Sequence, residues 1–247
     1  MKKMFALLLA ASMLGGAALA ETTVDATTGA SQVTTPDTQL PQEEIKALAL
    51  EYLRGFPLTK NEDGTTKEWA YREMYQIATV HDNMPGLSSV EFVIDPETMR
   101  LYASSEKGTE KVVDISKNEN VVMYWYKQIP EDEYVPQVND FNSYGVQIKG
   151  TARLMTGEED SFFRGASLYM RTLYGPERWD AMDEETQRAT IGRIAQVNEW
   201  IEILPTEYNV TSLYWSFNKE DSRRPQYYDP ESPYFGKDAR QVYIVTE

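Results

Sequence analysis

His81 is the only histidine in this chain of 247 residues, so it is the natural place to look for proton transfer near neutral pH. An imidazole can donate a proton to a substrate, and it can also ligate a haem iron. Asp82 and Asn83 follow it directly, and these residue types are typical of turns. The turn favours a simpler interpretation, in which His81 is an exposed residue without a special role.

Several other kinds of site are excluded by residue type or spacing. The chain has no cysteine, which rules out disulfides and thiolate metal sites, and a single histidine rules out polyhistidine sites. No Gly-x-Ser-x-Gly motif occurs, which argues against a Ser-His-Asp hydrolase. The acidic clusters 131–133 and 183–185 lack the alternating oxygens of a calcium loop, and helix-start charge and solubility explain them. We predict no metal site, and the sequence identifies no catalytic residue.

Two groups of side chains could contact a small ligand. Arg223 and Arg224 form a locally basic patch beside tyrosines, and it could hold a small anion or form salt bridges with the many acidic residues. A second group consists of aromatic residues in predicted strands, which could stack on a flat ring or contribute to the core or a dimer contact. This second group is Tyr124, Trp125, Tyr126, Tyr214 and Trp215.

The ends and the charge of the chain limit its partners and location. Residues 1–20 contain two lysines, an apolar run and a small-residue end at Ala20, which is the layout of a cleaved signal peptide. Residues 21–40 are polar and predict a flexible linker, and 41–247 form one domain without a further membrane-spanning run. A net charge of −15 disfavours nucleic acid. We therefore expect an exported protein, periplasmic or extracellular, without stable membrane insertion.

The elements that must position any site are mostly short strands, with helices between them. A helix opens at Pro41 and presents its apolar residues on one face. A second, short helix is expected over 110–117, and two amphipathic helices follow, one around 163–173 and one carrying Ile191, Ile194, Val197, Ile201 and Leu204. The predicted fold class is a β-rich α+β domain. Its strands are 75–80, 87–94, 99–104, 121–126, 145–155, 210–217 and 241–245.

The order of motifs in these strands matches a known family. Ile77–Val80 reads Ile-Ala-Thr-Val, Pro85 opens the next strand, Leu101–Ser105 leads to Lys111, and Asn118 precedes a fourth strand. Gly150 followed by a small residue permits close packing in a later strand. This order resembles the FMN-binding split β-barrel family of pyridoxamine 5'-phosphate oxidase. The resemblance implies a split β-barrel with flanking and inserted helices.

The resemblance also implies an FMN at a homodimer interface. Its phosphate would be held by Ser105, Thr109 and Lys111, with Ser88 on the second strand, and Lys107 would either reach the same pocket or remain a solvated loop residue. The family has basic residues at Ser88 and Val93 and an arginine at Glu110, so much of the usual positive charge is missing. The family's carboxy-terminal arginine and histidine are also absent, and we do not expect oxidation of pyridoxamine phosphate itself.

Three functions follow from these observations. The first is a secreted, FMN-binding oxidoreductase that acts on an unidentified small molecule through flavin chemistry. The second is a non-catalytic split-barrel protein that has lost flavin and binds haem or another small planar or anionic ligand. The third is an envelope-interaction protein whose groove is empty. The missing basic residues favour the second, and the family resemblance favours the first.

Overall fold

The computed structural model describes residues 39–53, 73–128, 143–157, 159–212, 230–232, 235–237 and 240–246, all within the compact unit Gln39–Glu247. The predicted signal peptide, the linker up to residue 38, the cluster 131–133 and the residues Tyr214, Trp215, Arg223 and Arg224 lie outside the described residues. Leu40 is buried, and its backbone N–H donates to Gln241 Oε1 at 2.7 Å. The packed part of the chain therefore starts before the predicted boundary at residue 41.

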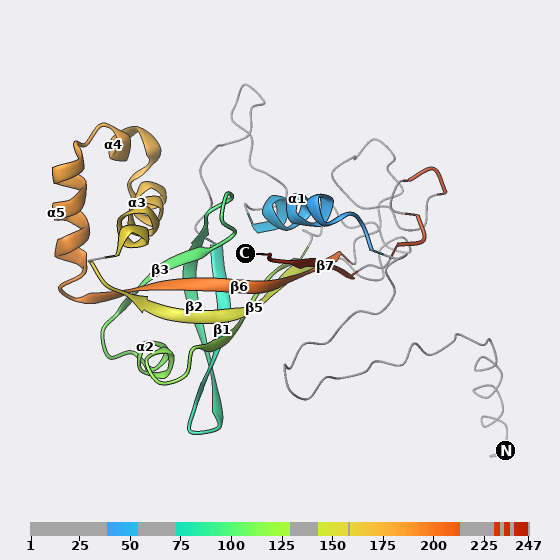
Figure 1. The fold of residues 1–247 in the computed structure, drawn as a ribbon, viewed down its shortest axis with the longest axis horizontal. Coiled ribbons are helices and arrows are strands. Elements are labelled where there is room, and N and C mark those ends of the chain that lie inside the picture. The colour runs from blue at the N-terminus through green and yellow to red at the C-terminus, as the bar shows by residue number, and fades with distance from the viewer. Residues whose placement is uncertain are drawn as a thin grey trace, which may run out of the picture. The chain divides into compact units, whose positions relative to one another are not determined.

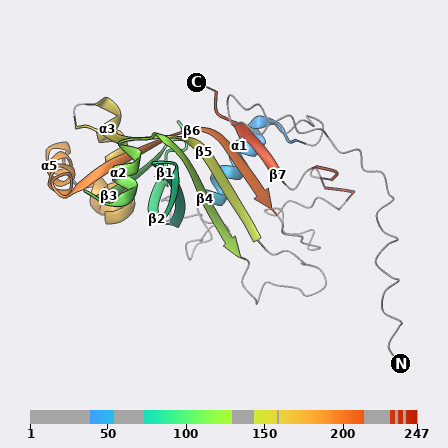
Figure 2. The same ribbon diagram turned by 90° about the horizontal axis from the view of Figure 1, so that it is seen from below.

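Seven strands form one antiparallel sheet in the order β3-β2-β1-β4-β5-β6-β7, and an additional β3–β6 ladder closes six of them into a barrel (Figure 1, Figure 2). The predicted split β-barrel with flanking and inserted helices is confirmed. The strands are β1 (Glu73–His81), β2 (Met84–Ile94), β3 (Leu101–Glu106), β4 (Asn120–Gln128), β5 (Ser143–Met155), β6 (Asn198–Ser212) and β7 (Arg240–Ile244). The helices are α1 (Gln42–Leu53), α2 (Glu110–Ile115), α3 (Asp160–Tyr174), α4 (Pro176–Asp180) and α5 (Glu184–Ile194).

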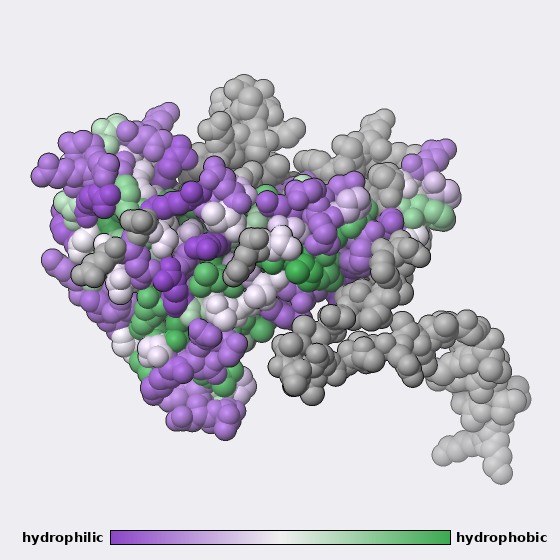
Figure 3. All heavy atoms as spheres, viewed as in Figure 1, coloured by the Kyte–Doolittle hydropathy of each residue, from purple (hydrophilic) through white to green (hydrophobic). Residues whose placement is uncertain are grey.

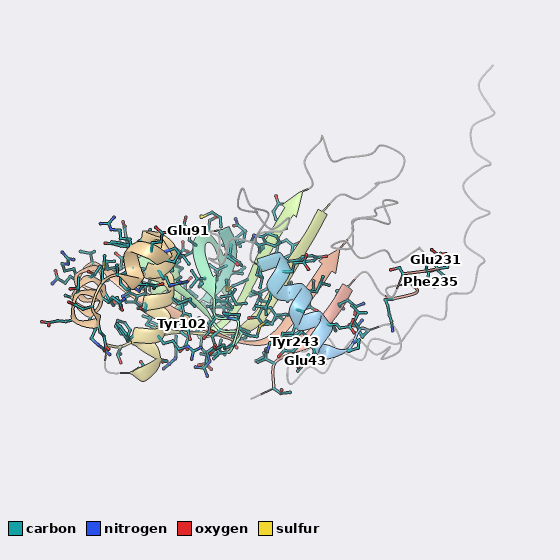
Figure 4. The ribbon with its side chains drawn as sticks, turned by 90° about the horizontal axis from the view of Figure 1, so that it is seen from above. Glu43, Glu91, Tyr102, Glu231, Phe235 and Tyr243 are labelled. Atoms are coloured by element: carbon teal, nitrogen blue, oxygen red, sulfur yellow. The ribbon has the colours of Figure 1, made fainter. Side chains whose placement is uncertain are left out.

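Helix α1 covers the sheet at β5, β6 and β7. The apolar face predicted from its spacing is the face that is buried. Figure 4 shows Tyr243 of β7 beside this helix. The buried residues of α1 are Ile45, Leu48, Ala49, Tyr52 and Leu53.

The glycine expected to allow close packing does so between β5 and β6. A Cβ atom added at Gly150 would lie 2.3 Å from the carbonyl oxygen of Leu204 and 2.8 Å from Pro205 Cα. The pairing of β5 with β6 shifts register between Lys149 and Gly150, as expected at a β-bulge. The two backbones can approach this closely because residue 150 has no side chain.

The prediction that the second amphipathic helix continues to Leu204 is wrong. Helix α5 ends at Ile194, and Ile201 and Leu204 belong to β6. Residues Trp200 to Ile203 are all buried, because one face of β6 points into the barrel core and the other packs against α3, α4 and α5. A strand buried on both faces shows no alternation, and its apolar residues continued the helical spacing by coincidence.

The helices α3, α4 and α5 pack on β3 and β6 through a second hydrophobic cluster. Phe162 and Tyr169 of α3 meet the Trp200 ring edge to face, with centroids 6.2 and 5.6 Å away. Figure 4 shows Tyr102 on the side of β3 that faces α3. This helical layer therefore rests directly on the two strands that close the barrel.

Candidate functional site

Strands β2 and β3 pair at only two positions, Val93 with Tyr102 and Ile94 with Leu101. Beyond them β3 pairs with β6 up to Glu106, while β2 pairs with β1 from Met84 to Phe92. The two strands therefore diverge, and the turn after β3 leads directly into α2. We call this divergence the split. Three of the five predicted binding residues lie at the end of β3 or in the β3–α2 turn, namely Ser105, Lys107 and Thr109.

Ser105 and Thr109 are brought together in the β3–α2 turn. Their hydroxyl oxygens are 3.2 Å apart, and Ser105 is buried. The Thr109 hydroxyl also lies 2.9 Å from the Glu106 carbonyl oxygen, to which it donates. Thr109 is the N-cap residue of α2, yet its side chain makes no capping hydrogen bond. Both hydroxyls thus bind within the turn.

The two predicted lysines behave differently. Lys107 Nζ lies 3.8 Å from Glu199 Oε1 on β6, so this side chain is directed at the neighbouring strand. Lys111 is half-buried and makes no ion pair with any residue of the described segments. Ser88 is half-buried on β2, paired with Ile77 of β1. Of the predicted set, Lys111 is the side chain whose charge is not balanced by a described partner.

Acidic side chains lie at the place where the family's basic residues were expected. A Cβ atom added at Gly86 would be 3.6 Å from Glu110 Oε1 and 3.4 Å from Asp114 Oδ2. It would also be 3.3 Å from Thr79 Oγ1. Gly86 and Ser88 lie two residues apart on β2 and therefore share one face of the strand. Two carboxyl groups from α2 consequently line the end of β2 that carries Ser88.

Asp114 anchors α2 to the β1–β2 hairpin, and the sequence did not reveal this. Its side chain is 1% exposed, and its Oδ2 accepts a hydrogen bond of 2.6 Å from the Thr79 hydroxyl. Its Oδ1 lies 3.1 Å from His81 Nδ1. The Glu110-x-x-x-Asp114 spacing could have indicated that both carboxyl groups share one face of the helix.

His81 is not the free exposed turn residue that the sequence favoured. The turn itself consists of Asp82 and Asn83, which have φ values of +48° and +64°. The His81 side chain is 32% exposed, with Nε2 at 2.8 Å from Lys117 Nζ and 3.1 Å from Asp82 Oδ2. Since both ring nitrogens already have neighbours, binding a haem iron would require one of these contacts to break.

A flavin phosphate needs several hydrogen-bond donors together with positive charge. The split offers the Lys111 ammonium, but its two turn hydroxyls already bind within the turn. The Glu110 carboxylate carries the same sign of charge and would repel a phosphate placed next to Gly86 and Ser88. The described residues therefore do not fit the phosphate of FMN.

A buried charge network lies away from the split. Glu202 is fully buried, and its carboxylate accepts hydrogen bonds from Arg153 Nε at 2.6 Å and from Arg100 Nη1 at 3.1 Å. The Tyr102 hydroxyl also donates to it, at 3.3 Å. Burial and the nearby Glu202 carboxylate raise the pKa of Tyr102 to about 12. The network links β3, β5 and β6, which is a structural role.

A groove of about 460 Å³ is lined by the β2–β3 turn and by α3, α4 and α5. Its two arginines already have partners. Arg164 is bound by Asp95 and Glu97, and Arg171 by Asp180. This groove therefore offers no unbalanced positive charge to an anionic ligand. Among the described residues, no group of acidic and histidine side chains is arranged to hold a metal ion.

The outer face of β1, β2 and β4 exposes apolar side chains. Leu87 of β2, Ala78 of β1 and Val122 of β4 lie in one cross-strand row, and Leu87 is 71% exposed. Tyr124 and Tyr126 stack on this face with ring centroids 5.9 Å apart, whereas Trp125 between them points into the core. Figure 3, which shows one side of the molecule, likewise has hydrophobic atoms over the strands and mainly hydrophilic ones over α3 to α5.

Comparisons with known proteins agree with this architecture. The chain matches the Pyridoxamine 5'-phosphate oxidase family over residues 65–200, more than half of its length. The closed barrel with a split between β2 and β3 defines a split-barrel protein. This chain belongs to the pyridoxamine 5'-phosphate oxidase family. No curated protein sequence shows significant similarity to it.

Solved structures with a similar arrangement share little sequence with this chain. The conserved hypothetical protein Rv2991 of Mycobacterium tuberculosis is 12% identical, with a TM-score of 0.46 over 72% of this chain and 89% of that one. HutZ, a heme storage protein of Vibrio cholerae, is 14% identical, with a TM-score of 0.40 over 66% and 88%. A FAD-binding protein of Mesorhizobium loti is 13% identical, with a TM-score of 0.38 over 56% and 84%.

Proposed function

We propose that this protein binds a flavin at the split and is a flavin-dependent oxidoreductase acting on a small molecule. Its family membership supports this function, and FMN is the cofactor that the family resemblance implies. The observation that carries the proposal is the divergence of β2 from β3 after two paired positions, next to the β3–α2 turn where the family resemblance implies a flavin. When bound, a flavin would supply the redox chemistry, and the chain would orient it and control access of the substrate.

Flavin titration of the purified chain tests this proposal. We expect the visible spectrum and fluorescence of an added flavin to change on binding, with saturation at one flavin per chain. Photoreduction of the bound flavin would then report whether it is redox active. A chain that changes neither signal for FMN nor for riboflavin contradicts the flavin-binding function.

A second candidate function is supported by the carboxyl groups of Glu110 and Asp114 beside Gly86. They oppose the phosphate of FMN, and a non-catalytic binding protein that keeps the split and takes a planar ligand other than a flavin would also account for them. Haem is one such ligand, although His81 already has contacts at both ring nitrogens. Addition of haem, followed by comparison of wild type with His81→Gln, tests that ligand. Haem binding without flavin binding would select this second function.

We also propose that the protein is a homodimer that uses the apolar face of β1, β2 and β4. Exposed Leu87, Tyr124 and Tyr126 support this, because contiguous apolar surface marks interaction sites. Sedimentation equilibrium should give twice the chain mass for wild type and a monomer for Leu87→Lys. Val197→Lys provides a matched control, since it adds the same charge at another exposed apolar residue, which lies between α5 and β6 and outside this face.

Export is proposed from the N-terminal sequence. Cell fractionation and N-terminal sequencing should find the protein outside the cytoplasm, starting at Glu21 after removal of residues 1–20. A chain retained in the cytoplasm with its N-terminus intact contradicts export. Among the described residues, no helix has the length and apolar character needed to cross a membrane.

A further inference from the structure

We infer that the split recognises a flavin without using a phosphate group, so that riboflavin binds at least as tightly as FMN. This inference rests on the proposed flavin-binding function and specifies its ligand class. It departs from FMN, which the family resemblance implies. The reason lies in the charges and hydrogen bonds around the β3–α2 turn.

The hydroxyl groups of the turn are the first part of the argument. Ser105 and Thr109 lie 3.2 Å apart and share one hydrogen bond, and Thr109 also donates to the Glu106 carbonyl oxygen at 2.9 Å. A hydroxyl has a single proton to donate. For Thr109 to bind a phosphate oxygen it must give up its contact with Glu106, which holds the turn into α2. A phosphate would therefore compete with the local structure of the turn.

Charge is the second part. Glu110, at the start of α2, and Asp114, one helical turn later, both direct a carboxyl oxygen at Gly86 of β2. Glu106 is also on the same turn and is exposed. A phosphate beside Ser88 would face this acidic cluster, whereas the uncharged ribityl chain of riboflavin would find hydrogen-bond acceptors there.

The basic residues do not reverse this balance. Lys107 lies 3.8 Å from Glu199, and Lys117 contacts His81 at the opposite end of α2. Lys111 is left as one ammonium group next to Glu110 in sequence. One unbalanced lysine among several carboxyl groups does not supply the clustered positive charge by which proteins hold a phosphate.

Isothermal titration of the purified full chain with riboflavin and with FMN is the direct experiment. We expect the dissociation constant of riboflavin to be equal to or lower than that of FMN. If FMN binds about tenfold tighter than riboflavin or more, phosphate recognition is present, so the inference fails while the flavin-binding function stands. If neither flavin binds, the proposed function fails and the inference fails with it.

Charge reversal at one position makes the test specific. Glu110→Arg should raise the affinity for FMN by roughly 10- to 100-fold, the range expected for one new charge-assisted contact, and leave riboflavin unchanged. Glu185→Arg is the matched control, because Glu185 is likewise an exposed acid in the first turn of a helix, α5. An equal effect of both variants, or no effect of Glu110→Arg, would place the phosphate elsewhere and overturn the inference.

Discussion

Two glycines in the helical layer should respond to alanine in opposite directions. Gly165 of α3 and Gly192 of α5 are both inside helices, where alanine is intrinsically better by roughly 0.5–1 kcal/mol. A Cβ atom at Gly192 would meet nothing within 4 Å. At Gly165 it would lie 2.3 and 2.4 Å from two ring atoms of Tyr102 on β3.

The size of the difference follows from these contacts. Carbon atoms pack at about 3.5–4.0 Å, so the Tyr102 ring or α3 must move by more than about 1 Å to accept the methyl group. Tyr102 is 1% exposed and hydrogen-bonded to Glu202, which leaves little room for such a shift. Overpacking of this kind costs about 1–3 kcal/mol. We expect Gly165→Ala to destabilise by about 1–2 kcal/mol and Gly192→Ala to stabilise by about 0.5–1 kcal/mol.

Urea unfolding of the full chain, followed by circular dichroism, measures both variants. The midpoint should fall for Gly165→Ala and rise for Gly192→Ala, without a change in the slope of the transition. Thermal midpoints should differ by about 6 °C between the two variants, at about 2–4 °C per kcal/mol for a domain of this size. Equal stabilisation by both substitutions would refute the docking of α3 on β3 described here.

Three further predictions concern charges and caps. Glu202→Gln should destabilise by about 1–3 kcal/mol in urea unfolding, because Arg153 loses its buried carboxylate but stays 42% exposed to water. The pKa of Tyr102 is raised from 10 to about 12, so its contribution to the free energy of unfolding should be full below pH 10 and lost as the pH rises toward 12. Tyr102→Phe should make the free energy of unfolding depend less on pH in this range. The hydrogen bond from the backbone N–H of Thr186 lowers the pKa of Asp183, the N-cap of α5. Asp183→Ala should therefore destabilise the protein fully at pH 7 and less at acidic pH, where the carboxylate of the wild type is protonated. A difference in free energy of unfolding that does not change with pH would contradict this.

Much of the fold followed from local patterns. The apolar spacing from Ile45 to Leu53 predicted both α1 and its buried face, and the strands β1 to β5 were predicted close to their observed limits. Helix α1 and most of β1, β2, β4 and β5 face solvent on one side, so that burial leaves a periodic pattern in the sequence. In β3, Leu101, Tyr102 and Ala103 are all buried, and this strand was located by the turn residues 95–98 before it. β6 was misjudged from residue 198 to 204, because a strand covered on both faces carries no such period.

The sequence placed Ser105 and Thr109 near one another, and their hydroxyls are 3.2 Å apart in the structure, but it did not indicate the charges around them. That these two residues and Lys111 of α2 bind a ligand stays a prediction. The sequence alone did not show that the Thr109 hydroxyl donates to the Glu106 carbonyl oxygen, or that the carboxyl groups of Glu110 and Asp114 both lie near Gly86. The first contact joins residues only three apart and depends on the exact conformation of the turn. The second depends on how α2 packs against the distant β1–β2 hairpin, which neighbours in the chain do not determine.

The β3–β6 ladder has a consequence for how this protein can be altered. Residues 101 to 106 pair with β6, the strand that follows α3, α4 and α5. The backbone N–H of Lys107 donates to the carbonyl oxygen of Val197, just before β6 begins. β3, on one side of the split, is thus tied by backbone hydrogen bonds to the strand that follows α5, whereas β2, on the other side, is paired with β1. Substitutions in α3 or α5 that displace β6 should therefore displace β3 relative to β2 without changing a residue of either strand.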